Sequence, residues 1–91
     1  MNIEITRTAQ AYAAYLDGER VGELSYARDG SRVTAIHTEV SPAAKGRGIG
    51  KALARALLDD ARAAGDTVVA KCPFVASYLD RHPEYADLRA G

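Results

Sequence analysis

Glycine alternates with longer residues in one short segment whose chemistry suits phosphate binding. The segment Lys45-Gly46-Arg47-Gly48-Ile49-Gly50 follows an extended stretch that ends near Val40 and precedes a helix-like run at residues 51–64. Glycine permits positive φ and lets another group approach the backbone closely. The start of a helix offers unpaired N–H groups and the positive end of the helix dipole. The sequence therefore predicts an anion site here, and the expected anion is the phosphate or pyrophosphate of a cofactor.

Two other phosphate loops fit this segment poorly. The Walker pattern needs a Ser or Thr after Gly-Lys, but Gly50-Lys51 is followed by Ala52, which leaves no hydroxyl for magnesium. The dinucleotide fingerprint is Gly-x-Gly-x-x-Gly. Its last glycine would stand three residues after Gly50, where this sequence has Leu53. A purely structural glycine turn remains the alternative to a phosphate loop of a third kind.

The elements that position this loop are predicted from apolar spacing and turn residues. Alternation predicts a meander of four strands at residues 3–5, 12–16, 21–27 and 32–40. Helical spacing then runs from Ile49 to Ala64 and ends at Gly65, and a strand at 67–72 and a short helix at 74–81 follow. The strand–helix–strand unit predicts a crossover between two parallel strands. Asp60 falls near the apolar stripe of the helix, which the spacing does not explain.

Composition limits the classes of function. The 91 residues include 12 basic and 12 acidic side chains, and this zero net charge argues against a nucleic-acid-binding domain. The one cysteine excludes an internal disulfide and fits a reducing compartment. There is neither a signal-peptide pattern nor an apolar run of about 18 residues, so no membrane segment is expected. We expect a single cytoplasmic domain over residues 1–91, as a monomer or weak homodimer.

The loop and three flanking segments resemble a known family. The loop is similar to the acyl-CoA pyrophosphate loop of the GNAT superfamily of N-acetyltransferases, Gln/Arg-x-x-Gly-x-Gly/Ala, with Lys45 where Gln or Arg is usual. The segments that resemble the very short GNAT-like family are His37-Thr38-Glu39-Val40, Lys71-Cys72-Pro73-Phe74-Val75 and His82-Pro83-Glu84-Tyr85. The resemblance implies an α+β fold with a mixed, mostly antiparallel sheet, one long helix and a short C-terminal helix.

The same resemblance implies acetyl-CoA as co-substrate and no metal. Its pyrophosphate would lie on main-chain N–H groups in the loop, and Arg47 or Lys51 would add positive charge. Its pantetheine arm would enter a gap between the strand at 38–40 and the strand at 69–72. The binding residues implied are Thr38, Val40, Lys45, Gly46, Arg47, Gly48, Ile49, Gly50 and Lys51.

Four side chains are candidates for the transfer chemistry. Glu39 is the candidate base for the amine, and its alternative is a solvated strand carboxylate. His37 points to the same face as Glu39 by strand alternation and could relay a proton, or could be a surface or packed histidine. Tyr78 matches the position of a tyrosine that protonates the CoA sulfur in many GNATs; its alternative is a packing residue. Cys72 could accept the acetyl group, lie beside the cofactor, or be a small buried apolar residue.

One departure from the family affects the acceptor. Larger GNATs have two helices between the first two strands, which form a wall of the acceptor site, and here only a few residues separate Thr6 from Tyr12. The acceptor groove is therefore expected to be open, as for a protein or peptide amine, or to be completed by a partner. The predicted function is acetyl-CoA-dependent N-acetyl transfer to a primary amine. The alternative is a non-catalytic acyl-CoA sensor or adaptor.

Overall fold

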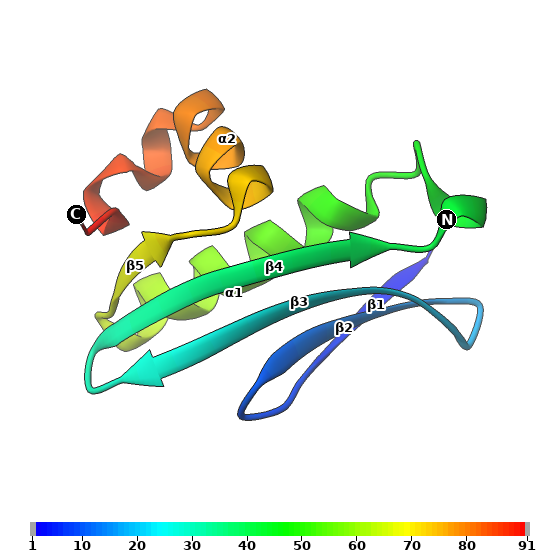
Figure 1. The fold of residues 1–91 in the computed structure, drawn as a ribbon, viewed down its shortest axis with the longest axis horizontal. Helices are drawn as coiled ribbons and strands as arrows, with labels where there is room; N and C mark the ends of the chain where they lie inside the picture. The colour runs from blue at the N-terminus through cyan, green and yellow to red at the C-terminus, as the bar shows by residue number, and fades with distance from the viewer. Residues whose placement is uncertain (1, 91) are drawn as a thin grey trace.

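Five strands and two α-helices form the fold in the computed structural model, which describes residues 2–90 (Figure 1). Met1 and Gly91, the ends of the predicted domain, lie outside the described residues. In chain order the elements are β1 Ile3–Arg7, β2 Ala11–Leu16, β3 Glu19–Asp29, β4 Arg32–Val40, the 3₁₀ turn η1 Pro42–Ala44, α1 Ile49–Ala64, β5 Thr67–Ala70, α2 Pro73–Arg81 and the 3₁₀ segment η2 Pro83–Leu88. This order agrees with the predicted meander, loop, long helix, strand and terminal helix.

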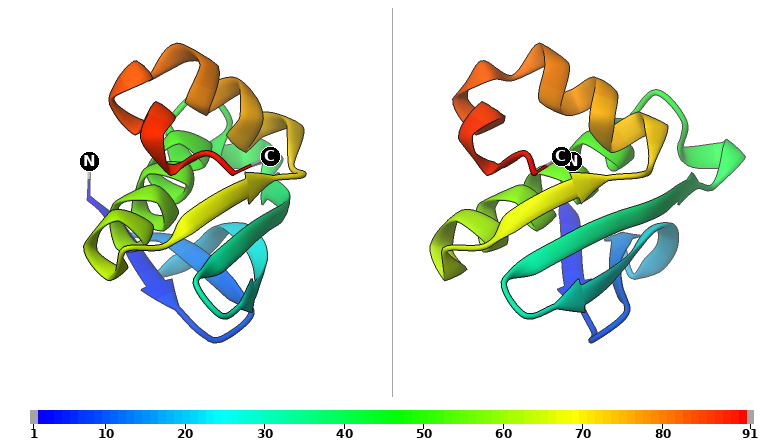
Figure 2. Two further views of the ribbon diagram at one scale, coloured as in Figure 1. Left: turned by 90° about the vertical axis from the view of Figure 1, so that its left-hand side faces the viewer. Right: turned by 60° about the vertical axis from the view of Figure 1, so that its left-hand side comes forward.

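The sheet has the order β1-β2-β3-β4-β5 and mixed strand directions. Strands β1 to β4 pair antiparallel, whereas β4 and β5 pair parallel on either side of the α1 crossover. Helix α1 lies along one face of the sheet. Helix α2 and η2 lie next to α1, on the side of the sheet where β4 and β5 pair (Figures 1 and 2). Residues 8–10 alone connect β1 to β2, so the α+β fold without N-terminal helices is confirmed.

The core lies between α1 and the sheet. The apolar stripe of α1 is buried against inward-facing residues of the strands, as its spacing predicted. The largest fully buried side chains are Leu24, Ile49, Leu53, Leu57, Leu58, Val68, Val75 and Cys72. Asp60, the misfit in the stripe, accepts hydrogen bonds from the Tyr12 hydroxyl at 2.8 Å and from Arg7 at 3.0 Å. These contacts join α1 to β1 and β2 and give the carboxylate its place on this face.

Both ends of α1 are fixed by glycine. Gly48 is the N-cap at φ 78°, and Gly65 is the C-cap at φ 74°, where its N–H meets the carbonyls of Ala61 and Arg62. Only glycine adopts this left-handed conformation without strain. The predicted end of the helix at Gly65 is confirmed.

A β-bulge at Ile36 interrupts the regular alternation of β4. Ala35 pairs with Tyr26 and His37 with Ser25, so Ile36 has no partner across the ladder. The extra residue reverses which side chains face the helix after that point. Thr38 pairs with the fully buried Leu24 and faces α1. Consequently His37 and Glu39 share the opposite face, as predicted for the pair.

Strand β5 is shorter than the predicted strand at 67–72. It ends at Ala70 because the N–H groups of Lys71 and Cys72 both donate to the Ala35 carbonyl at 3.0 Å, which turns the chain away from β4. Pro73 then begins α2, where its missing N–H costs nothing. The early end of β5 leaves the last part of β4 without a strand neighbour on that side. Within residues 2–90 no helix is long and apolar enough to cross a bilayer.

Candidate functional site

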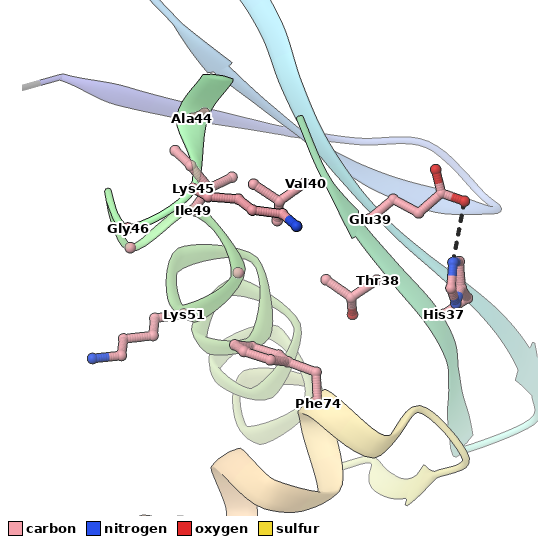
Figure 3. Close-up of a pocket in the computed structure, with 12 residues that line it drawn as sticks. His37, Thr38, Glu39, Val40, Ala44, Lys45, Gly46, Ile49, Lys51 and Phe74 are labelled. Atoms are coloured by element: carbon pink, nitrogen blue, oxygen red, sulfur yellow. Dashed lines mark hydrogen bonds and ion pairs between the residues drawn. The ribbon is translucent and has the colours of Figure 1, made fainter. Parts of the chain in front are cut away.

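The glycine segment borders a pocket of about 620 Å³ between the end of β4 and the first turns of α1 and α2 (Figure 3). We call this the loop pocket. Its lining residues are His37, Thr38, Glu39, Val40, Ala44, Lys45, Gly46, Gly48, Ile49, Gly50, Lys51 and Phe74. Folding thus brings most of the predicted binding residues together with Glu39 and His37. Arg47, Cys72 and Tyr78 are not among the lining residues.

The three glycines of the loop serve different physical needs. Gly46 and Gly48 have φ of 83° and 78°, and a Cβ at either would meet nothing within 4 Å. They are therefore required for backbone conformation and not for space. A Cβ at Gly50 would lie 2.8 Å from Cζ of Phe74, so this glycine makes room for the ring.

Phe74 is a pocket residue to which the sequence analysis gave no role. It lies in the first turn of α2, and the residue remains 41% exposed. In Figure 3 the ring lies opposite Thr38, below the start of α1. The sequence signal that could have indicated this role is a large apolar residue directly after Pro73.

The N terminus of α1 has no side-chain cap, and it opens on the pocket. The N–H of Ala52 makes the first helical bond, to the Gly48 carbonyl at 3.0 Å, and no side chain caps the helix. The N–H groups that precede Ala52 in the helix have no acceptor among the described residues. No acidic residue stands in the first turn, and Lys45 extends across the pocket toward β4 (Figure 3). Anions are favoured at such a position.

Glu39 and His37 form a pair on the face of β4 opposite Thr38 and Val40 (Figure 3). His37 Nε2 lies 3.1 Å from Glu39 Oε1, and the two side chains are 62% and 76% exposed. Glu39 also borders a second depression of about 430 Å³, the strand hollow. It is lined by Arg20, Val21, Gly22, Glu23, Glu39, Val40, Ser41 and Pro42. Glu39 and Val40 thus stand where the loop pocket meets the strand hollow.

The strand hollow contains an ion pair that the sequence analysis did not connect with the site. Arg20 and Glu23 are 2.6 Å apart, and Glu23 is the cross-strand partner of Glu39. The sequence could not show that Arg20 and Glu23 lie near Glu39, because the register of β3 against β4 decides which β4 residue is opposite them.

Cys72 lies behind the wall of the loop pocket. Its side chain is 2% exposed, and its Sγ is 3.1 Å from Oγ1 of Thr38, which lines the pocket. The buried thiol thus contacts a residue of the pocket wall and does not itself line the loop pocket.

Tyr78 lines a third depression of about 580 Å³ between α1 and α2, the helix hollow. Its other lining residues are Gly48, Lys51, Ala52, Arg55, Ala56, Asp59 and His82. The Tyr78 ring stacks on His82 with centroids 3.8 Å apart, and burial raises the pKa of its phenol. The helix hollow adjoins the loop pocket at Gly48 and Lys51. The role of Tyr78 as a proton donor stays a prediction.

Comparison with known proteins connects this arrangement to one family. A family model described as GCN5-related N-acetyl-transferase matches residues 11–88. A search of curated proteins gave no match. Among solved structures, the chain is similar to a GCN5-like protein of Staphylococcus aureus, with 27% identity and a TM-score of 0.77, over 99% of this chain and 90% of that one.

Larger enzymes share the fold over part of their length. The ribosomal-protein-alanine N-acetyltransferase of Brucella melitensis biovar Abortus 2308 is 26% identical over 89% of this chain, with a TM-score of 0.63. The ribosomal-protein-S18-alanine N-acetyltransferase of Escherichia coli is 17% identical over 68% of this chain, with a TM-score of 0.62, and shows the fold alone. The chain spans 63% and 42% of these two proteins.

Proposed function

The chain belongs to the GCN5-related N-acetyltransferase family, and from this premise we propose that it transfers an acetyl group from acetyl-CoA to a primary amine. The observation that carries the proposal is the position of the α1 N terminus, which has no side-chain cap, beside the end of β4 that lacks a strand neighbour on the β5 side, in one pocket with Glu39. Each part of this arrangement suits a different part of the reactants.

The loop fits the pyrophosphate of the co-substrate. The free N–H groups at the start of α1 donate toward the pocket, and Gly46 and Gly48 hold the backbone in the left-handed turn that presents them. Lys45 and Lys51 add positive charge at the rim. No acidic side chain in the first turn of α1 opposes an anion.

The edge of β4 fits the pantetheine arm. β5 pairs with β4 only from Arg32 to Ala35, so peptide groups beyond the bulge have no strand beside them there. An amide-containing arm can hydrogen-bond to such an edge as an added strand would. Thr38, Val40 and Phe74 line this part of the pocket and offer it apolar contact.

The position of Glu39 supports a role as the base for the amine. It borders both the loop pocket and the strand hollow, so an acceptor that enters over the face of the sheet without α1 would reach the thioester beside this carboxylate. Glu39 takes a proton from the ammonium, directly or through water, and His37 at 3.1 Å can carry it to solvent. The neutral amine then attacks the thioester carbonyl, the C–S bond breaks, the nitrogen releases its extra proton to solvent to give the amide, and the thiolate takes up a proton.

The open face favours an amine on a protein or peptide. Only residues 8–10 connect β1 and β2, and Figure 2 shows no helix of the described chain on the face opposite α1. The name of the similar Brucella protein indicates a protein substrate for that enzyme.

We also propose that Tyr78 donates the proton that the thiolate takes up. A fall in kcat in Tyr78→Phe would support this role.

Two measurements test the proposal. Isothermal titration of the full chain with CoA tests the site, and coenzyme at about 100 times its dissociation constant should add roughly 2.7 kcal/mol of stability. In a domain of this size that raises the melting temperature by at least about 10 °C. Acetyl-CoA with a panel of peptides carrying free α-amines or lysines, and of small amines, then tests transfer by mass spectrometry. Binding without transfer to any acceptor would show a sensor, and absence of binding would reject both functions.

A further inference from the structure

The strand hollow continues from the loop pocket toward β3. Its lining residues are 20–23 in β3 and 39–42 at and after the end of β4. Because Glu39 and Val40 border both depressions, an amine that reacts beside Glu39 has the loop pocket on one side and the strand hollow on the other. In an acceptor larger than a simple amine, the groups next to the reactive nitrogen therefore lie in the strand hollow.

Two carboxylates stand directly opposite each other along this path. Glu23 of β3 pairs with Glu39 of β4, so the two side chains lie on the same face of the sheet. Residues paired in this way have Cβ atoms about 4.5–5.5 Å apart, and like charges at such positions repel each other. A positive group of the acceptor that lies beside both carboxylates relieves this repulsion.

Arg20 makes the preference for a positive group one-sided. Its guanidinium is 2.6 Å from Oε2 of Glu23, and the two side chains are about half exposed. An acidic group that bound Arg20 would take it from Glu23 and leave Glu23 unpaired beside Glu39. A basic group can bind Glu23 while the Arg20 contact persists, because a carboxylate accepts hydrogen bonds at both oxygens.

The rest of the hollow fits a long side chain with a charged end. Its apolar lining residues are Val21, Val40 and Pro42, and they lie in the same depression as the Glu23 carboxylate. Lysine and arginine combine an apolar stem with a terminal cation, so the stem would cover the apolar part while the cation meets the carboxylate.

We propose that the strand hollow selects acceptor peptides in which a basic residue is next to the reactive amine, and that Glu23 determines this specificity. The inference rests on the proposed function, which puts the reactive amine beside Glu39. It adds the class of substrate, since Glu23 is one strand farther from the coenzyme and meets the neighbouring residue of the acceptor.

The test measures acetyl transfer by the full chain from saturating acetyl-CoA to three peptides. They share the sequence of the best acceptor in the panel and differ only in the residue next to the reactive amine, which is arginine, glutamine or glutamate. Arginine represents the basic class because its guanidinium stays protonated and adds no second acceptor. At low salt, kcat/KM should be about fivefold higher with arginine than with glutamine, chiefly through KM, and lowest with glutamate. High salt should reduce the differences.

Three variants identify the residue responsible. Glu23→Gln should reduce the arginine-to-glutamine ratio to below about twofold. Arg20→Gln removes the opposing positive charge and should raise the ratio. Asp29→Asn removes a carboxylate at the other end of β3 and should leave the ratio unchanged. Because Glu23 does not line the loop pocket, titration of Glu23→Gln with CoA should match the unaltered chain and so shows that the variant is folded.

The outcomes separate this inference from the proposed function. Transfer to all three peptides at equal kcat/KM, transfer to small amines alone, or an unchanged ratio in Glu23→Gln overturns the role of Glu23 and leaves the acetyltransferase proposal intact. An equal fall of the ratio in Asp29→Asn, or a fall in Arg20→Gln, also overturns it. Absence of transfer to any acceptor overturns the proposed function and this inference with it. A ratio that falls in Glu23→Gln and persists in Asp29→Asn supports the assignment.

Discussion

The Sγ of Cys72 lies 3.1 Å from the Oγ1 of Thr38, and the thiol is covered while the threonine lines the loop pocket. This contact joins the start of α2 to the end of β4, at the place where β5 no longer holds the two together. Thr38 is therefore both part of the pocket wall and a cover for the only cysteine of the chain.

Cys72→Ala is expected to retain acetyl transfer to within about threefold, because the thiol is buried and does not line the loop pocket. The loss of a small buried side chain should lower the free energy of unfolding by about 1 kcal/mol. Steady-state kinetics and urea unfolding measure the two effects. A loss of more than about 100-fold in kcat with normal CoA binding would instead show that the acetyl group passes through Cys72.

Gly50→Ala is expected to weaken CoA binding by about tenfold, with a change in folding stability below about 1 kcal/mol. A Cβ here would lie 2.8 Å from the tip of the Phe74 ring, and because that ring is partly exposed it can swing away and open the pocket wall. Phe74→Ala should weaken binding by a similar factor. Since both changes remove the same wall, the double variant should bind no more weakly than either single one, and additive losses would contradict this account.

Glu39→Gln is expected to lower kcat by about 100-fold and to leave the dissociation constant of CoA unchanged, because it removes a general base and no coenzyme contact. His37→Gln should lower kcat by a smaller factor, since water can replace a proton relay. Glu4→Gln, an exposed carboxylate on β1, is the matched control. An active Glu39→Gln enzyme would show that another group deprotonates the amine.

Tyr12→Phe is expected to remove part of the loss of stability in alkali. Burial, chiefly, raises the pKa of Tyr12 to about 12, and Asp60 acts in the same direction. An unfolded tyrosine ionises near pH 10, so the stabilisation is complete below that pH and is lost between pH 10 and 12. Urea unfolding from pH 9 to 12 measures it, and Tyr15→Phe, on the other face of β2, should behave like the unaltered chain. Identical curves for all three proteins would contradict this role for Tyr12.

Local patterns were sufficient for the elements and for the loop. Turn residues, alternation and helical spacing act over a few neighbours, so the four strands, the glycine turn and the helix that Gly65 caps could be predicted directly from the sequence. The family and the α+β fold followed from segments with a fixed order along the chain, and the comparisons confirm both.

Long-range pairing decided what the local patterns could not. Strand β5 ends at Ala70 because the N–H groups of the next two residues both donate to the carbonyl of Ala35 in β4. The space for the Phe74 ring depends on Gly50, which is distant in sequence. Neither relation has a signature in its own segment. The helix hollow likewise exists only because α2 packs beside α1.

The sequence by itself determined that His37 and Glu39 share a face, because side chains two apart in a strand point the same way. Only the tertiary structure decided which face that is. The bulge at Ile36 arises from the register of β4 against β3, and it turns Thr38 toward α1 and Glu39 toward the open side of the sheet. Alternation within a strand is set by local backbone geometry, whereas register is set by a partner strand.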